Sequence, residues 1–172
     1  MAIQGNSYER ELKNLLSGEE KAIVKVVKTC DEREKSAYEN LRINPFMVVR
    51  AAGSMGADLV ALRENHSFLI EVKSSCDSII HFSRNLHLME QANKMKEECF
   101  KARVLLIYAF RLKNQRGDPW RIFYLPIDED LKGTMGLLQR RLPKIKHSVN
   151  GNYLMKWSDG MKLSEFIEYM LL

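Results

Sequence analysis

Three charged residues stand close together in a segment that is otherwise apolar: Asp58, Glu71 and Lys73. Two carboxylates and a main-chain carbonyl form a hard-oxygen ligand set of the kind that suits Mg²⁺ or Mn²⁺. A lysine beside such a set can orient a water molecule, or help to deprotonate it, for attack on a phosphodiester. These residue types therefore indicate metal-assisted phosphodiester hydrolysis. A simple ion cluster at the end of a sheet is the alternative, because the pattern is short and common.

The elements that must position these residues form a predicted β-hairpin. Two short apolar segments, 57–63 and 68–74, flank a polar turn at 64–67. Successive side chains of a strand point to opposite faces, so Glu71 and Lys73 share one face. If the tip is centred between residues 65 and 66, Asp58 lies directly opposite Lys73 and diagonal to Glu71. We therefore expect the three charges to meet at one edge of the sheet.

The rest of the chain alternates between helical and extended patterns. Helices are expected over 6–16, 17–42, 85–102, 130–142 and 163–172. Further strands are expected over 46–52, 103–110 and 120–127, with a possible edge strand over 152–157. The tract 103–110 is apolar almost throughout, which is typical of a strand buried on both faces. This order predicts an α/β fold with a mixed sheet flanked by helices.

Composition excludes several classes of protein. The chain has 172 residues and a net charge of +5, and residues 101–172 hold 13 basic and 7 acidic side chains. This mild basic bias suits a polyanion partner. No apolar run approaches the roughly 18 residues that a membrane span needs. Three cysteines without a CxxC pair and the absence of an export signal lead us to expect a cytoplasmic protein. The four histidines lack zinc-ligand spacing.

Three stretches together resemble one known family. They are "YERELKNLL" at 8–16, "VVRAAGSMGADLVAL" at 48–62 and "FLIEVKSS" at 68–75. In this order they resemble the archaeal Holliday-junction resolvases, within the PD-(D/E)XK nuclease superfamily. The resemblance implies a restriction-endonuclease-like α/β fold, with a mixed central sheet flanked by helices, in a single domain spanning 1–172. It also implies a Mg²⁺-dependent homodimer that binds branched DNA and cuts four-way junctions by paired phosphodiester hydrolysis, with Mn²⁺ as a plausible substitute.

The resemblance assigns roles to the residues of the site. Asp58 and Glu71 would be metal ligands, with the Val72 carbonyl completing the set, and Lys73 would position the attacking water. Glu9 would contribute to the metal site directly or through water. A purely structural role for Glu9 stays open, because an Asn6 cap followed by Glu9 three residues later is a capping-box pattern.

The resemblance also marks residues for contact with DNA: Arg10, Arg50, Ser54, Arg84, Gln91 and Lys94. Arg10 and Arg50 match positions that contact phosphates or support the active site. Ser54 matches a serine in a mobile loop near the scissile phosphate and counts among the catalytic candidates. The other three are expected on the helix after the active strand. An ordinary polar surface is the alternative for this helix and for Arg50.

One departure from the family pattern concerns the stretch 19–45. Roughly 25 extra residues, helical in character, separate the first helix from the first strand; Ser17 and Glu20 offer a capping box for them. The apolar residues of this stretch cover more than one helix face, so we expect some to be exposed and to serve a subunit or partner contact: Ile23, Val24, Val26 and Val27. The closing helix is a second candidate for dimerisation, through Phe166, Tyr169 and Met170. A nuclease for another DNA structure and a non-catalytic DNA-binding relative remain alternatives.

Overall fold

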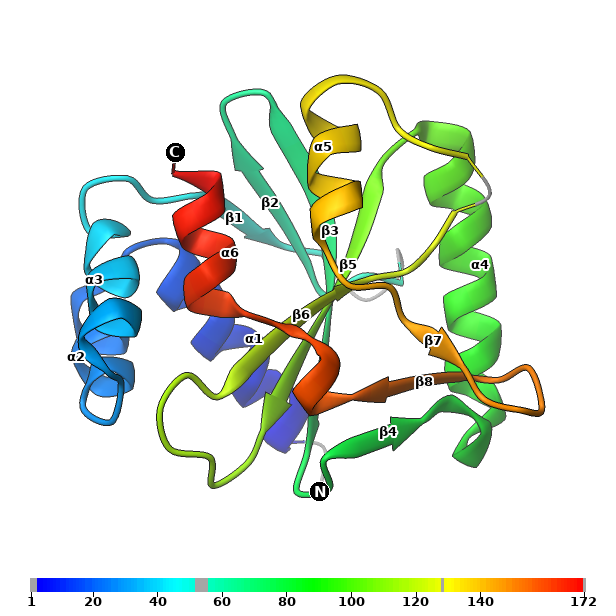
Figure 1. Ribbon diagram of the computed structural model, residues 1–172, viewed down its shortest axis with the longest axis horizontal. Helices are drawn as coiled ribbons and strands as arrows, with labels where there is room; N and C mark the ends of the chain where they lie inside the picture. Colours follow the sequence, from blue (N-terminus) through cyan, green and yellow to red (C-terminus); the bar gives the residue numbers. More distant parts are fainter. Residues whose placement is uncertain (1–2, 52–55, 128, 172) are drawn as a thin grey trace.

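The computed structural model describes residues 3–51, 56–127 and 129–171, with side chains from Ser7 onward (Figure 1). Its helices are α1 (Ile3–Leu16), α2 (Glu20–Val27), α3 (Glu32–Asn40), α4 (Leu86–Ala102), α5 (Gly133–Arg141) and α6 (Leu163–Met170), with short 3-10 turns at η1 (Phe82–Arg84) and η2 (Trp157–Asp159). No helix in the described ranges is long and apolar enough to span a lipid bilayer.

The main sheet has six strands in the order β1-β2-β3-β5-β6-β9. Their bounds are β1 (Met47–Arg50), β2 (Leu59–Arg63), β3 (His66–Ser75), β5 (Leu105–Leu112), β6 (Trp120–Tyr124) and β9 (Met161–Lys162). Neighbouring strands are antiparallel except for β3 and β5, which run parallel. Figure 1 shows α1, α2, α3 and α6 gathered on one side of this sheet and α4 on the other. The predicted class, a mixed α/β sheet flanked by helices, is confirmed.

A second, smaller sheet was not predicted. It consists of β4 (Ile79–His81), β8 (Tyr153–Lys156) and β7 (Lys146–His147), in the order β4-β8-β7. The segment 152–157 is therefore the central strand of this sheet, and the prediction of an edge strand is wrong. The physical reason is that β4 is too short to show alternation, and it pairs with a strand more than 70 residues away along the chain.

Burial in the core confirms the prediction for β5 and corrects the one for the closing helix. Six consecutive residues of β5, from Leu105 to Phe110, are buried. In α6, Phe166 packs its ring against Phe46 and Phe68, with ring centroids 6.5 and 5.7 Å away, and Met170 is also buried. Phe166 and Met170 lie inside the subunit's own core, so the prediction that these two residues mediate dimerisation is wrong. Tyr169 is only partly buried, and a dimer contact by its side chain stays a prediction.

The stretch 19–45 forms α2 and α3 and contributes to the same core. Its residues with at most 1% exposure are Ile23, Ala37, Tyr38 and Leu41. Val24 is 42% exposed, whereas Val26 and Val27 are partly buried, so the prediction that the four apolar residues of α2 do not share one buried face is confirmed. The predicted capping box at Ser17 is wrong, because the N-cap of α2 is Glu19, without a side-chain cap. A capping box instead begins α3, between Asp31 and Glu34.

Candidate functional site

The β2–β3 hairpin brings Asp58 to Glu71. The observed register pairs Arg63 with His66 and Leu59 with Ile70. Extending it by one residue places Asp58 across from Glu71, so the predicted pairing with Lys73 is wrong by two residues. A slip of two leaves every side chain on the same face of the strand, whereas a slip of one would reverse it. The predicted meeting of the three charges at one sheet edge is therefore observed.

The Asp58 carboxylate is held by the backbone of β3. Its Oδ2 accepts a hydrogen bond of 2.7 Å from the Val72 N–H. Burial is the largest influence on its pKa, which lies above the usual value; the negative charge of Glu9 raises it further. The Val72 N–H and the cations of Lys73 and Arg50 act in the opposite direction. Asp58 is thus within electrostatic reach of Glu9, Lys73 and Arg50.

Glu71 is the most deeply buried carboxylate of this group. Its side chain is 4% exposed, and its Oε1 lies 2.6 Å from the Lys73 Nζ. Burial raises the pKa of Glu71 to about 7, with a further rise from Asp58, while Lys73 lowers it. The second oxygen, Oε2, is buried and accepts no hydrogen bond. A buried polar atom without a partner costs free energy and requires an explanation, such as a bound ion.

Glu9 reaches this site from α1. Its Oε2 lies 2.7 Å from the Arg50 Nη2, so the first helix and the end of β1 are joined by an ion pair beside Asp58. The helix begins at Ile3, which places Glu9 in its second turn. The alternative that Glu9 serves as the third residue of a capping box with Asn6 is therefore wrong.

Gln91 of α4 touches the site in a way that the sequence analysis missed. Its Nε2 donates to the Glu71 Oε1 at 3.1 Å and to the Gly56 carbonyl at 2.8 Å. Gly56 has a φ of +80°, and a Cβ there would lie 2.5 Å from the Met95 Sδ, so only glycine fits this turn. Gln91 thus holds both the buried carboxylate of β3 and the turn that leads to Asp58.

The donor set suits a hard divalent cation. Asp58 and Glu71 offer carboxylate oxygens at one sheet edge, and Glu71 Oε2 lacks a protein partner. Within the part of the chain that the structure describes, no three His, Cys, Asp or Glu side chains gather into a ligand set by themselves. A site with two carboxylates suits Mg²⁺, because this ion usually retains several waters and takes one or two carboxylates from the protein. The residues present therefore fit this ion.

Most of the chain matches one known protein family. The model of the family described as archaeal Holliday junction resolvase (hjc) matches residues 28–170, which is most of the chain. The chain belongs to this family. Asp58, Glu71 and Lys73 lie inside the matched stretch of the resolvase family. The match begins within the stretch 19–45, and α1 lies outside it, so the geometry of the Glu9–Arg50 pair is what connects α1 with the site.

The chain was also compared with solved structures and with curated proteins. Among solved structures, the chain is similar to Hjc of Archaeoglobus fulgidus, a Holliday junction resolvase from an archaeal hyperthermophile. The identity is 18%, the TM-score is 0.45, and the alignment covers 84% of this chain and 96% of that one. No curated protein matches the sequence.

The residues predicted to contact DNA in this resolvase-family member lie on several elements. Arg10 is exposed on α1, and Lys94 is exposed on α4. Arg84 lies in η1 and not on α4, exposed and 3.9 Å from Asp77. Ser54 lies outside the described residues. Arg50 and Gln91 are engaged with carboxylates of the protein, and DNA contact by any of these residues stays a prediction.

The contact between Gln91 and Glu71 predicts a catalytic effect. Gln91→Ala is expected to lower junction cleavage about 10- to 100-fold and to raise the Mg²⁺ concentration for half-maximal rate, because the amide of Gln91 holds the Glu71 carboxylate in position for a cation. Junction affinity in EDTA should not change. Asn93→Ala, at an exposed position of the same helix, is the matched control. Unchanged cleavage with weakened DNA binding would instead assign Gln91 to the DNA surface.

Proposed function

We propose that this protein is a Mg²⁺-dependent, structure-selective DNA endonuclease that resolves four-way junctions by paired phosphodiester hydrolysis. One observation carries the proposal: in a member of the resolvase family, the hairpin brings Asp58 to Glu71, whose buried Oε2 lacks a protein partner. A carboxylate buried without its full set of partners costs free energy. A cation bound there would offset that cost.

The protein residues divide into ligands and supporting groups. Asp58, Glu71 and the Val72 carbonyl would hold Mg²⁺ or Mn²⁺, with Glu9 contributing directly or through water. The bound ion would act as a Lewis acid and offset the negative charge that develops on the phosphate. The Val72 N–H orients the Asp58 carboxylate, and Arg50 orients Glu9.

In this proposal Lys73 positions the attacking water. Its Nζ lies against the Glu71 Oε1, and its charge lowers the pKa of both carboxylates. An ammonium group in this position can donate a hydrogen bond to a nearby water and orient it toward the phosphorus. Because the ammonium also stabilises ionised Glu71, it favours the protonation state that binds a cation.

The raised pKa of Glu71 predicts how cleavage depends on pH. At low Mg²⁺, cleavage should rise as the pH passes about 7, because the cation binds only the ionised carboxylate. At saturating Mg²⁺ the midpoint should move to lower pH, since the ion displaces the proton. Rate–pH profiles at two Mg²⁺ concentrations test this prediction; a midpoint independent of Mg²⁺ would contradict it.

The raised pKa of Glu71 also affects the stability of the metal-free protein. Its contribution to folding is fully present below about pH 4.5 and is lost as the pH rises through about 7.

The proposed assembly is a homodimer, because two symmetric cuts need two sites related by a two-fold axis. The support comes from the β1–β2 hairpin. One face of it contributes Val48 and Ala61 to the core, whereas its other face exposes Met47, Val49 and Leu62. Met47 and Leu62 are cross-strand partners, so these apolar side chains lie together. This surface takes the place of the closing helix in the proposed interface.

A substrate panel tests the proposal. A four-way junction, a flap and a linear duplex of matched sequence are incubated with the protein in Mg²⁺ and in EDTA. Cutting of the junction alone, and only with Mg²⁺, is expected. Equal cutting of flap or duplex would favour a nuclease for another DNA structure. Tight binding without divalent-dependent cutting of any substrate would favour a non-catalytic DNA-binding relative.

A further inference from the structure

A cleft of about 360 Å³ lies between α1, α2 and the loop that joins β5 to β6. One face of α1 forms its first wall, because Ser7, Arg10, Glu11 and Asn14 follow helical spacing. The opposite walls come from α2, from the end of β5 and from the loop; their lining residues include Lys21 and Lys25 of α2, Arg111 of β5 and Gln115 of the loop. The cleft is thus built largely from side chains that the proposed catalytic site does not use.

The charge in this cleft is unbalanced. Glu11 is neutralised within the protein, since its Oε1 accepts from the Arg111 Nε at 2.9 Å and from the Trp120 Nε1 at 3.1 Å. Among the described residues, no carboxylate pairs with Arg10, Lys21 or Lys25, and Glu19 is the other acidic residue of the lining. An excess of positive charge therefore remains for a ligand outside the chain.

The spacing of the two lysines supports a function in binding. Lys21 and Lys25 are four residues apart on α2, so they lie on one helix face, and like charges at this spacing disfavour the helix. Ile23, on another face of the same helix, is fully buried and anchors α2 to the core. Core packing thus holds the two cations toward the cleft despite their mutual repulsion.

Arg111 of the cleft and Lys73 of the candidate catalytic site lie toward the same end of two central strands of the sheet. Strands β3 and β5 are parallel, and their carboxyl ends are joined by a hydrogen bond from Lys113 N–H to the Ser75 carbonyl. Arg111 of the cleft is the register partner of Ser74, the residue after Lys73. The side chains of Arg111 and Lys73 therefore emerge on opposite faces of neighbouring strands, one residue apart.

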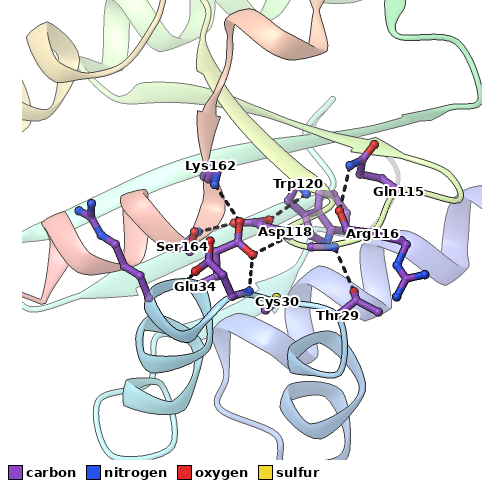
Figure 2. A network of polar contacts seen from close by, with 12 residues as sticks. Thr29, Cys30, Glu34, Gln115, Arg116, Asp118, Trp120, Lys162 and Ser164 are labelled. Carbon is purple, nitrogen blue, oxygen red and sulfur yellow. Dashed lines mark hydrogen bonds and ion pairs between the residues drawn. The ribbon is translucent and has the colours of Figure 1, made fainter.

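A polar network holds the cleft walls together (Figure 2). The Gly117 N–H donates to the Thr29 Oγ1 at 3.1 Å, and the Asp118 N–H donates to the Glu34 Oε2 at 3.2 Å. The Glu34 Oε1 in turn lies 2.8 Å from the Lys162 Nζ. These contacts fasten the β5–β6 loop to the turn that follows α2 and to α3, so the cleft is formed before any ligand arrives.

We propose that this cleft binds the phosphodiester backbone of a DNA strand that leaves the catalytic site, through Arg10, Lys21 and Lys25. This inference rests on the proposed function and extends it, because it assigns a role to α2. A phosphate backbone has the repeated negative charge that three unpaired cations require, and lysines bind phosphates as point charges. The site at Asp58 and Glu71 would engage the scissile phosphate, while the cleft would orient the adjoining strand.

The test compares two double variants that lose the same charge. Lys21→Gln/Lys25→Gln removes the cleft lysines, and Lys35→Gln/Lys101→Gln removes two exposed lysines outside the cleft. Affinity for a fluorescent four-way junction is measured by anisotropy in EDTA over a salt series, so cleavage is not required. Circular dichroism confirms that both variants are folded.

The cleft variant should bind about tenfold more weakly at moderate salt, and the magnitude of its log–log salt slope should fall by about 2, for two phosphates at about 0.9 each. The control variant should keep a slope close to the wild-type value. Equal slopes for the two variants, whether lowered or unchanged, would overturn the proposal. Wild-type protein that binds no junction would contradict the proposed function itself, whereas wild-type binding with equal variant slopes would contradict the cleft alone.

Discussion

Asp58→Asn is expected to lower junction cleavage by about 1,000-fold or more while leaving junction binding intact or tighter. Loss of a charged ligand removes several kcal/mol of transition-state stabilisation, and each 1.4 kcal/mol corresponds to about tenfold in rate. The Asn Oδ1 can still accept from the Val72 N–H, so the hairpin should keep its structure. Binding should not suffer, because the substitution removes a negative charge near the DNA phosphates.

Single-turnover cleavage and EDTA binding assays on the same preparation measure both effects. Glu71→Gln should behave in the same way, since it removes the other carboxylate. Asp77→Asn is the matched control, because Asp77 is an exposed carboxylate shortly after β3. Turnover by Asp58→Asn close to the wild-type value would mean that this carboxylate does not take part in the chemistry.

Asp118→Ala is expected to destabilise the fold by about 3–5 kcal/mol, which is a large share of the stability of a domain. Asp118 is 2% exposed, and its carboxylate accepts from the Tyr38 OH at 2.9 Å. It also accepts from the Trp120 N–H at 3.0 Å and the Ser164 N–H at 2.7 Å (Figure 2). Truncation to alanine would leave these three donors buried without an acceptor, and each orphaned group carries its own desolvation cost.

Thermal and urea unfolding measure this loss, which should lower the Tm by about 10 °C for a chain of this size. Asp130→Ala, at an exposed position, should change stability by less than about 0.5 kcal/mol. A decrease of less than about 1 kcal/mol for Asp118→Ala would show that α3, α6 and the β5–β6 loop do not depend on this carboxylate.

Much of the candidate site follows from the sequence because a strand has a period of two. Alternation alone places Glu71 and Lys73 on one face, and that inference survives an error of one residue in the centre of the turn. The direct partner of Asp58 does depend on the turn, which is why the predicted pairing with Lys73 failed. Short turns are set by local backbone geometry that the apolar pattern does not report.

The supporting role of Gln91 could have been predicted from the helical periodicity of α4. Gln91 lies beside the partly buried Leu88 and the buried Ala92 and Met95, on the apolar stripe of α4. A polar side chain within an apolar stripe needs a partner in the interior, and a buried carboxylate on the facing strand is such a partner. The pattern therefore contained a signal for a supporting residue of the site.

The stretch 19–45 could be predicted as helical but not as part of the core. Its helices carry many charged residues, and the burial of Tyr38 depends on a carboxylate 80 residues away, at Asp118. The same applies to Glu34, whose ion pair with Lys162 joins segments separated by 128 residues. Local helix propensity contains no information on such distant partners, so neither contact could be predicted from the sequence.

The most direct test of paired, metal-dependent resolution is cleavage of a supercoiled plasmid that extrudes a cruciform. Two cuts within one binding event convert the plasmid to a linear product, whereas a single cut gives an open circle. We expect linear product from the wild-type protein only with Mg²⁺ or Mn²⁺, and neither product from Asp58→Asn. Absence of both products with a folded protein that binds the cruciform in the presence of Mg²⁺ would contradict the account.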